Sequence, residues 1–438
     1  MKRFLMDMHP VKRLAGVTLL SLLVLALAVV WDNWGDMLWD PKAPTAPTPA
    51  STRSNEAQIE QGRYLALAGN CMACHTARGS VPLAGGRRIE TPFGGVYSSN
   101  LTPDPETGLG RWTADDFWQA MHHGRSKGGR LLAPAFPYNH TSVVSREDSD
   151  AVFAWLQTQA PVVQAQPAHT LVWPLGTQPA LAVWRSLFFE PSPFQVDKTQ
   201  SAEWNRGAYL VQGLGHCAAC HGQRNALGSF PAVDDLSGGY LSPQMWVAPS
   251  LVDPAQTTLS TASPKDTSQL LRVGQHASAS VSGPMAEFVQ QTGQYLSPAD
   301  SLAIATYLKS KVEPIRVETK PTLSNLATST PAAQSTYKTH CATCHGDNGQ
   351  GKGDAYPALA GNPAVVLAQP DNLIQMALYG GFGPSTEGRP SPYGMPPYLF
   401  TLNNQQIAEV LNHIRSQWGN KAPAVSPVQV DRVRASSY

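Results

Sequence analysis

The sequence has few charged residues, and neither sign dominates among them. Only 14% of its 438 residues are Asp, Glu, Lys or Arg, and the formal net charge is +1. Proteins that bind nucleic acid concentrate Lys and Arg to neutralise phosphates, often with aromatic side chains between them. No basic run of this kind occurs in the sequence, so we expect no nucleic-acid partner.

The sequence also lacks common short fingerprints of catalysis. It contains no G-x-G-x-x-G pattern for a dinucleotide in a strand-turn-helix unit and no G-x-S-x-G nucleophile elbow. Nothing in it therefore predicts a catalytic site of the chain's own.

No cysteine lies outside one repeated pattern. The six cysteines form three C-x-x-C-H motifs, which end at His75, His221 and His345. In this motif two thiols bond the porphyrin of a c-type haem, and the adjacent His ligates the iron. The two cysteines face the same side of one helical turn, which brings the His under the ring. We therefore predict three covalently bound haem c groups, attached to Cys71, Cys74, Cys217, Cys220, Cys341 and Cys344, with His75, His221 and His345 as iron ligands.

A zinc site, a redox-active dithiol and a structural disulfide are the alternatives for a single motif of this kind. Structural zinc sites complete a tetrahedron with a second ligand pair a few tens of residues away. These motifs lie more than about a hundred residues apart, and each has its own His. Haem is therefore the interpretation that accounts for all three motifs.

A long uncharged run near the N-terminus follows a short basic segment. Four Lys and Arg residues occur within the first 13 residues, and residues 14–31 then carry no charge over a length sufficient to cross a bilayer. By the positive-inside rule the remainder is extracytoplasmic. A cleaved secretory signal is the alternative, because Ala26-Leu27-Ala28 resembles a cleavage site, but this triplet lies inside the apolar run. We expect a retained anchor in the inner membrane, with the haem domains in the periplasm.

Similar segments flank the three motifs. Gly62-Arg63-Tyr64-Leu65 precedes the first and Gly207-Ala208-Tyr209-Leu210 the second, whereas the third has Tyr337 without a glycine. A small residue on such a leading helix allows a closing helix to approach closely, as in small cytochromes c. Helical patterns suited to closing helices follow the motifs over residues 145–157, 297–309 and 403–417.

We therefore predict a mainly α fold, with three consecutive class I cytochrome c-like domains behind one N-terminal transmembrane helix. Pro, Ala and Thr dominate residues 41–52, a composition typical of an extended tether. The predicted segments are a cytoplasmic tail (1–13), the anchor or signal (14–31), a Pro-rich linker (32–55), the first domain (56–160), a connecting segment (161–200), the second domain (201–315), a linker (316–330), the third domain (331–420) and a tail (421–438).

Methionines beside Gly and Pro are candidates for the sixth iron ligand in the second and third domains. A thioether opposite His raises the haem potential relative to two histidines. Met285 follows Gly283-Pro284, and Met395 lies between Gly394 and Pro396. We predict Met285 and Met395 as ligands, with Met245 and Met376 in reserve.

The first domain departs from this pattern. Its corresponding loop, residues 133–140, contains Phe136 and no Met, and phenylalanine cannot ligate iron. His140 is close in sequence and would give a haem with two His ligands and a lower potential. We predict His140 as the ligand. Met121, His122 and His123 remain alternatives, as does an open position.

The chain resembles the tri-haem cytochrome c subunits of bacterial membrane-bound dehydrogenases, which partner periplasmic alcohol, gluconate, sorbitol, fructose and aldehyde dehydrogenases. The resemblance covers about residues 56–420, and its specific stretches are residues 100–112 (NLTPDPETGLGRW) and residues 205–210 (NRGAYL) leading into 213–217 (GLGHC). It implies that a dehydrogenase catalytic subunit with molybdopterin, PQQ or flavin oxidises a substrate. It further implies that this chain carries the electrons to ubiquinone or a cytochrome acceptor.

Phe136 also departs from the family pattern. In many members the loop of the first domain reads Pro-Ala-Met-Pro-Tyr, so the resemblance supplies no Met ligand for the first haem. The Phe variant resembles cytochromes that accompany molybdopterin-dependent aldehyde or heterocycle oxidoreductases. A peroxidase-like enzyme is the alternative function, and it would need an open iron with a distal acid or base, which only the first haem could offer.

The connecting segment is unusually apolar for a solvated loop. It contains Trp173, Trp184 and Phe188-Phe189. Such a segment could bind the dehydrogenase, the membrane surface or the adjacent haem domains, and we expect it to pack on those domains.

Overall fold

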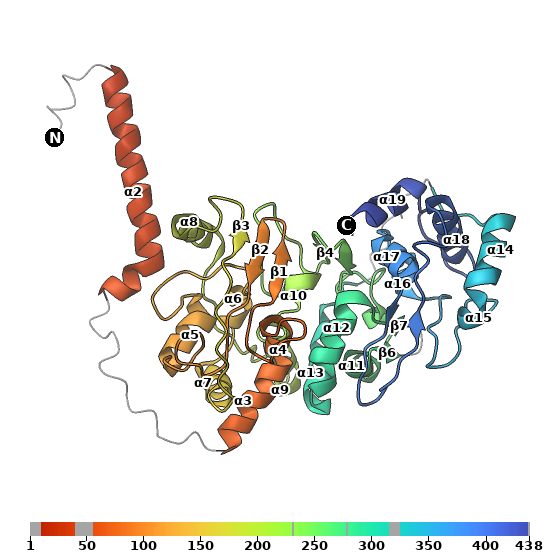
Figure 1. Ribbon diagram of the computed structural model, residues 1–438, viewed down its shortest axis with the longest axis horizontal. Helices are drawn as coiled ribbons and strands as arrows, with labels where there is room; N and C mark the ends of the chain where they lie inside the picture. Colours follow the sequence, from red (N-terminus) through yellow and green to blue (C-terminus); the bar gives the residue numbers. More distant parts are fainter. Residues whose placement is uncertain (1–9, 40–55, 230–231, 277–278, 315–324, 437–438) are drawn as a thin grey trace.

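The computed structural model describes residues 10–39, 56–229, 232–276, 279–314 and 325–436 (Figure 1). The predicted N-terminal tail lies outside this part up to residue 9, and the predicted linkers lie outside it over residues 40–55 and 316–324. Helices dominate the described chain, and its strands form short antiparallel ribbons. The mainly α class predicted from the sequence is confirmed.

One long apolar helix projects from the rest of the molecule. In the described residues helix α2 covers Pro10–Trp39. Within it Val17–Gly35 is long and apolar enough to cross a membrane. The helix continues past the predicted end at residue 31, through residues 32–39 of the predicted linker.

The first unit, residues 56–160, is a helical bundle beside a short β-ribbon. Helix α3 (Glu56–Ala68) leads into α4 (Cys71–His75), and α7 (Arg146–Leu156) closes the unit against α3. A Cβ on Gly62 would meet the carbonyl oxygen of Ala151 at 1.8 Å, so glycine is required where α3 crosses α7. The other elements are β1 (Arg88–Thr91), β2 (Gly94–Tyr97), α5 (Ala114–His123) and α6 (Tyr138–Thr141).

The second unit, residues 201–315, repeats the same helix pair. Helix α9 (Ala202–Gln212) leads into α10 (Ala218–His221), and α13 (Pro298–Lys311) packs on α9. Gly207 has the role of Gly62, because a Cβ there would meet the carbonyl oxygen of Ala303 at 2.0 Å. Between them lie β4 (Gly239–Leu241), β5 (Trp246–Ala248), η1 (Thr258–Ser260), α11 (Pro264–Val273), β6 (Gln275–His276), β7 (Ala279–Ser280), α12 (Gly283–Gln291) and η2 (Gly293–Tyr295).

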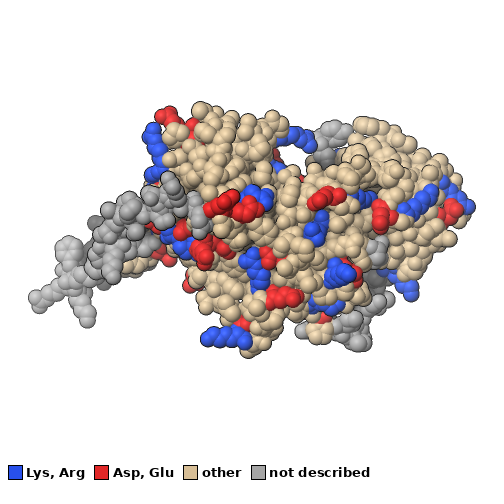
Figure 2. Space-filling view, turned by 90° about the horizontal axis from the view of Figure 1, so that it is seen from below, with Lys and Arg blue, Asp and Glu red and all other residues tan. Residues whose placement is uncertain are grey.

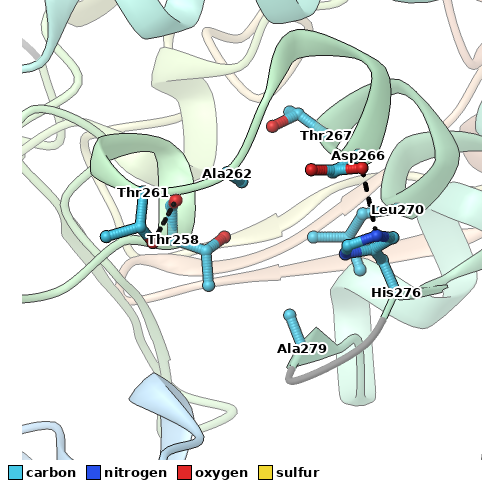
Figure 3. A pocket seen from close by; sticks show the side chains of 8 residues that line it. All are labelled: Thr258, Thr261, Ala262, Asp266, Thr267, Leu270, His276 and Ala279. Atoms are coloured by element: carbon cyan, nitrogen blue, oxygen red, sulfur yellow. Dashed lines mark hydrogen bonds and ion pairs between the residues drawn. The ribbon is translucent and has the colours of Figure 1, made fainter.

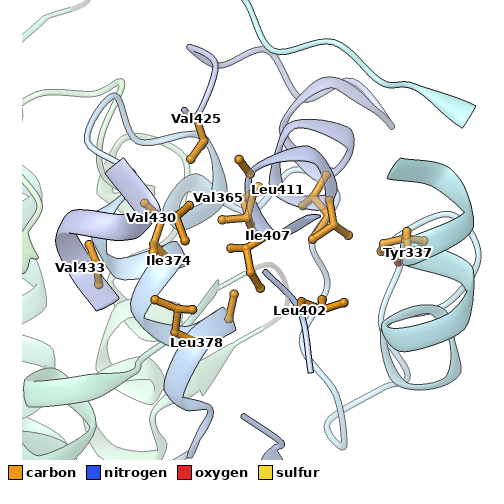
Figure 4. Packing of buried hydrophobic residues seen from close by; sticks show 14 of the residues in the cluster. Tyr337, Val365, Ile374, Leu378, Leu402, Ile407, Leu411, Val425, Val430 and Val433 are labelled. Atoms are coloured by element: carbon orange, nitrogen blue, oxygen red, sulfur yellow. The ribbon is translucent and has the colours of Figure 1, made fainter. Parts of the chain in front are cut away.

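The third unit, residues 325–436, has its own core (Figure 4). Tyr337 of α14 (Pro331–His340) and Ile407 of α18 (Asn404–Ser416) belong to it. The predicted tail folds back as α19 (Pro427–Ala435), because Val430 and Val433 are fully buried in the same core. The remaining elements are α15 (Ala342–His345), α16 (Pro363–Val366), α17 (Asp371–Tyr379), β8 (Gly381–Phe382) and β9 (Gly394–Met395).

The closing helices begin where the sequence predicts N-caps. The side chain of Ser145 accepts from the backbone N–H of Asp148, and that of Ser297 accepts from the N–H of Asp300. Asn403 forms a reciprocal capping box with Gln406 at the start of α18. The predicted helices at 145–157, 297–309 and 403–417 are therefore confirmed as α7, α13 and α18, with ends that differ by one or two residues.

The connecting segment is structured and joins two parts of the molecule. Strand β3 (Thr170–Leu171) pairs antiparallel with β2, which makes a three-stranded sheet with β1. Helix α8 (Gln178–Phe188) packs on α2. The segment thus packs partly on the first unit, as expected, and partly on the long apolar helix.

Candidate haem sites

Each C-x-x-C-H motif folds as a single helical turn that follows a leading helix, at α4, α10 and α15. The six cysteines are free thiols rather than disulfides. Burial raises the pKa of Cys71 and Cys217 to about 12 and that of Cys341 to about 11. The thiols of these three cysteines are therefore protonated at neutral pH in the absence of a bound group.

Each of the three motif histidines makes the same kind of hydrogen bond, from its ring nitrogen to a backbone carbonyl. Nδ1 of His75 lies 2.7 Å from the carbonyl oxygen of Ser99, Nδ1 of His221 lies 2.8 Å from that of Pro249, and Nδ1 of His345 lies 2.9 Å from that of Pro357. A carbonyl oxygen only accepts, so each Nδ1 carries the proton and Nε2 keeps its lone pair. Iron-ligating histidines are oriented in this way by their other ring nitrogen.

These carbonyl partners were missed in the sequence, although a weak repeat marks them. The oxygen comes from the residue 24, 28 or 12 positions after the motif His. Two positions beyond it stands a leucine, Leu101, Leu251 or Leu359, that packs against the core of its unit. The leucine fixes the loop in place, and the loop in turn presents the carbonyl to the ring.

A positively charged side chain also donates a hydrogen bond to each motif turn. The carbonyl oxygen of the residue before the second cysteine accepts from Arg87 in the first unit, from Arg224 in the second and from Lys352 in the third. The donor differs in type and in distance along the chain, yet the contact recurs in all three units. Each attachment turn therefore has a positive charge beside it.

The donor set fits haem rather than a protein-bound metal. Among the residues that the structure describes, which include all six cysteines, no three His, Cys, Asp or Glu side chains form a group that could hold a metal ion. A structural zinc site needs about four such ligands. Two thiols and one histidine with a free Nε2 per motif match covalent haem attachment.

The predicted ligand of the third unit lies next to its reserve. Met395 is in β9, where it pairs with Gly381 of β8. A Cβ on Gly381 would lie 3.7 Å from Sδ of Met376. Both thioethers are therefore on the same side of this ribbon and are half-buried.

The two candidate methionines of the second unit, Met285 and Met245, lie in different parts of the molecule. Met285 lies in the first turn of α12 rather than in a loop, and it is half-buried. Met245 is buried in the hydrophobic core of the third unit, to which the loop between β4 and β5 extends. Met245 thus packs in the third unit, whereas Met285 lies within the second unit.

In the first unit His140 is completely buried and faces the second unit. Its Nδ1 lies 2.8 Å from the carbonyl oxygen of Gln212, and its ring centre lies 6.4 Å from that of His216. Burial, and secondarily the neighbouring His216, lowers the pKa of His140 to about 3, so the ring is neutral. The Nδ1 bond to a carbonyl is the same as that of the motif histidines.

The side chains of the alternative ligands for the first haem make other contacts. Met121 is a buried member of the core of the first unit, and the half-buried Phe136, which stands in the expected Met position, packs against that core. His122 is stacked on Trp118, with ring centres 4.2 Å apart, and it meets His123 edge-on. The two histidines thus contact aromatic rings of their own helix.

The first two units bind each other through a reciprocal pair of tyrosines. Tyr64 of α3 donates to Asp300 at 2.6 Å and accepts from the backbone N–H of the N-cap residue of α13. Tyr209 of α9 donates to Asp148 at 2.6 Å and accepts from the N-cap N–H of α7. Each leading helix therefore caps the closing helix of the other unit, which gives an approximate two-fold relation.

Further contacts hold the first two attachment turns close together. Arg87 of the first unit forms a 2.8 Å ion pair with Glu287 of α12. Burial raises the pKa of Cys74, and the Cys220 thiol of the second unit is near enough to add to the rise. Haem groups bound to these two turns would therefore lie near each other.

The third unit is joined to the second through the β4–β5 hairpin. The side chain of Asn372 on α17 accepts from the N–H of Val247 at 2.8 Å and donates to its carbonyl at 2.7 Å. Gln375 donates to the carbonyl of Gln244, next to the buried Met245. The chain therefore forms one continuous body from the first unit to the third.

A small pocket on the second unit is separate from these sites (Figure 3). Asp266 and His276 face each other across it, with oxygen and nitrogen 3.1 Å apart. Its other lining residues are Thr258, Thr261, Ala262, Thr267, Leu270 and Ala279. None of them is a predicted attachment residue or iron ligand.

Comparison with known proteins agrees with this geometry. The cytochrome c family matches residues 331–418. The chain is 39% identical over 401 residues to the cytochrome c subunit of quinone alcohol dehydrogenase from Gluconacetobacter polyoxogenes, which covers 87% of this chain and 85% of that protein. It is 38% identical over 391 residues to the cytochrome c subunit of gluconate 2-dehydrogenase from Pantoea cypripedii, covering 86% and 89%.

A third relative has a different architecture. A nicotinate dehydrogenase subunit from Pseudomonas putida is 36% identical over 424 residues, which are 94% of this chain but only 34% of that protein. This chain therefore corresponds to one part of a longer polypeptide in that relative.

Proposed function

This chain belongs to the family of cytochrome c subunits of dehydrogenases and transfers electrons, and we propose that it does so through three covalently bound haem c groups. The observation that carries the number is the bond from each motif histidine to a backbone carbonyl, which occurs once in each unit. In this proposal the three units are class I cytochrome c-like domains, predicted at 56–160, 201–315 and 331–420, and the third also includes α19.

The chain's own residues have defined roles in this proposal. Haem supplies a one-electron couple at its iron, while the protein supplies attachment, axial ligands and burial. His75, His221 and His345 bind through Nε2, because Nδ1 donates to the carbonyl. The thioether bonds are made by Cys71, Cys74, Cys217, Cys220, Cys341 and Cys344.

The sixth ligands follow from the side chains available in each unit. Met285 and Met395 serve the second and third haems, and both are half-buried donors beside glycine and proline. His140 serves the first haem through Nε2, supported by its burial and by its Nδ1 bond to Gln212. The first haem would then have the lowest potential, because two histidines lower the potential relative to His and Met.

The electrons come from a dehydrogenase catalytic subunit. The relatives are subunits of alcohol, gluconate and nicotinate dehydrogenases. The family resemblance implies molybdopterin, PQQ or flavin as the cofactor of the partner. The acceptor is ubiquinone or another cytochrome. Phe136 in the first unit favours a molybdopterin partner only by analogy.

The chain works at the periplasmic face of the inner membrane. Helix α2 supplies the anchor, since its segment Val17–Gly35 is apolar and almost entirely uncovered by the rest of the molecule. The basic residues before it favour a cytoplasmic N-terminus, with the three units on the other side.

Gentle detergent extraction tests the relay directly. Co-purification with a larger subunit that bears PQQ, flavin or molybdopterin, and reduction of the haems by its substrate, is the expected result. A chain that emerges alone, and that no dehydrogenase substrate reduces, would falsify the proposed partner. Metal and haem analysis of the same sample should give three irons per chain, all in covalently bound haem.

A peroxidase-like reaction at an open first haem is not favoured, because the relatives that cover most of the chain are dehydrogenase subunits. Turnover of peroxide by the purified chain would support this alternative function instead.

A further inference from the structure

The end of α2 is fixed to α8 by buried polar contacts. Asn33 is 1% exposed, and its amide donates to the carbonyl of Ala182 at 3.1 Å and to the hydroxyl of Ser186 at 2.9 Å. Arg185 donates to Oδ1 of Asn33 at 3.0 Å. Val29 and Trp34 pack beside them on Leu181 and Ala182. The orientation of α8 relative to the long apolar helix is therefore defined.

The opposite face of α8 is apolar and open. Val183 and Leu187, one turn apart, are 48% and 64% exposed. The loop before the helix adds Val172 and Trp173, which are 63% and 83% exposed. The only charged residue in positions 171–189 is Arg185, which is 4% exposed because it points inward. We call these four exposed residues the α8 face.

We propose that the α8 face rests on the phospholipid surface beside α2, so that the first unit is held against the membrane. The inference rests on the anchoring role of α2 proposed above. Along α2 the side chains of residues 17–28 are exposed, whereas Asn33 and Gly35 are buried. The change from exposed to buried residues along α2 occurs where α8 contacts it. The boundary between lipid and protein would therefore lie at the same depth as the α8 face.

The arrangement of the molecule favours lipid over a protein partner. Figure 1 shows α8 beside the lower half of α2, whose upper half extends beyond every other element. The face seen from below in Figure 2 is different, because Lys, Arg, Asp and Glu are spread over it. An uncharged apolar surface with tryptophan, on a helix that packs against an anchor, is typical of the membrane interface.

Photolabelling of the full-length holoprotein tests this inference. The protein is reconstituted in phosphatidylethanolamine–phosphatidylglycerol vesicles that contain a phospholipid with a diazirine in its acyl chain, and labelled peptides are identified by mass spectrometry. We expect label in residues 17–31 and also in residues 171–189. Phe400 and Val428 of the third unit are 90% and 76% exposed and should remain unlabelled, which makes them internal controls.

Two variants sharpen the test. Val183→Glu with Leu187→Glu should remove most of the label from residues 171–189 and leave that in residues 17–31 unchanged. Val428→Glu, a matched substitution at an exposed apolar position, should change neither. The haem absorption spectrum of each variant shows that the fold is intact.

The outcomes separate the two proposals. Label in residues 17–31 alone overturns the inference about α8 and leaves the anchor in place. Label in neither segment overturns the anchor as well. Equal labelling of Phe400 and Val428 also overturns the inference, because exposed apolar residues would then react wherever they lie.

Discussion

The Nδ1 hydrogen bond of each motif histidine decides which ring nitrogen is left to bind a metal. His75, His221 and His345 all donate to a backbone carbonyl within 2.9 Å, and burial lowers the pKa of each ring. A neutral imidazole with a fixed tautomer is a prepared ligand. His140 has the same two properties, although no cysteine pair precedes it.

Replacing His140 with Ala should convert one haem of the three from low spin to high spin, because Ala offers no donor. Electron paramagnetic resonance of the oxidised holoprotein is the measurement. His122→Ala is the matched control, since His122 is engaged in a stack with Trp118. A His140 variant with an unchanged low-spin signal would exclude it as the ligand and return attention to Met121.

The cations beside the attachment turns should tune the haem potentials. A positive charge disfavours the oxidised iron, so its loss stabilises the oxidised form and lowers the midpoint potential. Arg87→Gln, Arg224→Gln and Lys352→Gln should therefore each lower the potential of one haem, its own, in a spectroelectrochemical titration. Arg63→Gln, which removes an exposed cation paired with Glu60, should lower none. A uniform shift of all three would contradict the local role.

At the scale of elements, the glycines at the helix crossings decide how closely each unit closes. Gly62 and Gly207 meet backbone carbonyls, which cannot move aside as a flexible side chain can. The third unit has no such glycine and instead packs Tyr337 against His413 and Trp418, with ring centres 5.1 Å away in each case. Two solutions to the same crossing therefore exist in one chain.

Gly62→Ala and Gly207→Ala should each lower the unfolding free energy by at least about 1–3 kcal/mol, the usual range for overpacking. Thermal unfolding followed by circular dichroism measures this loss. Gly128→Ala is the control, because no atom lies within 4 Å of the position a Cβ would take there. Equal stability of all three variants would mean that the helices can separate without cost.

The interface of the first two units should weaken in acid. Burial by itself raises the pKa of Asp300, but hydrogen bonds from Arg206 and Tyr64 outweigh it and hold this pKa below 3.8. A group whose pKa is lower in the folded state stabilises the fold above its unfolded pKa, and the contribution is lost as the pH falls through the folded value. Asp300→Asn should therefore reduce stability at neutral pH and flatten the decline toward low pH.

Urea unfolding at a series of pH values measures this effect. Asp150→Asn serves as control, because Asp150 forms a surface ion pair with Arg146, and such pairs contribute little. If Asp300→Asn retains the wild-type decline, the loss of stability in acid arises elsewhere.

At the scale of the whole molecule, the three units differ in how they are joined. In the first two units, a tyrosine of each leading helix caps the closing helix of the other unit. Each of these units also contributes a residue to the core of the other, because Leu214 packs in the core of the first unit and Val143 in that of the second. The third is attached at two places, through the β4–β5 hairpin on α17 and through Glu387, whose backbone N–H donates to the side chain of Gln294. The expected result is one rigid pair of haems and a third haem whose distance depends on these two contacts.

Asn372→Ala should slow electron exchange between the second and third haems severalfold without changing their potentials, because it removes both bonds to Val247 and no haem contact. Flash-induced reduction kinetics of the holoprotein measure the rate. Gln405→Ala, a change at an exposed side chain of the third unit, is the matched control. An unaltered rate in the Asn372 variant would show that other contacts fix the distance.

Local chemistry made much of this protein predictable from its sequence. A C-x-x-C-H motif works within one helical turn, a serine cap acts on the next three residues, and an apolar run of bilayer length is visible in composition. The motifs, the closing helices and the apolar helix could therefore be predicted, and the family resemblance was confirmed by the relatives.

Contacts between distant residues could not be read in the same way. Four such contacts join segments that are separated by variable loops. They are the hydrogen bonds of the motif histidines to backbone carbonyls, the bonds of Tyr64 and Tyr209 to the closing helix of the other unit, the packing of Met245 in the core of the third unit and the packing of α2 on α8. Sequence spacing fixes geometry only while the backbone is regular, and across a loop the packing of the folded chain decides it. The attachment motifs and the local helices are therefore predictable from the sequence, whereas the way the units and helix α2 lie against one another follows from packing in the folded chain.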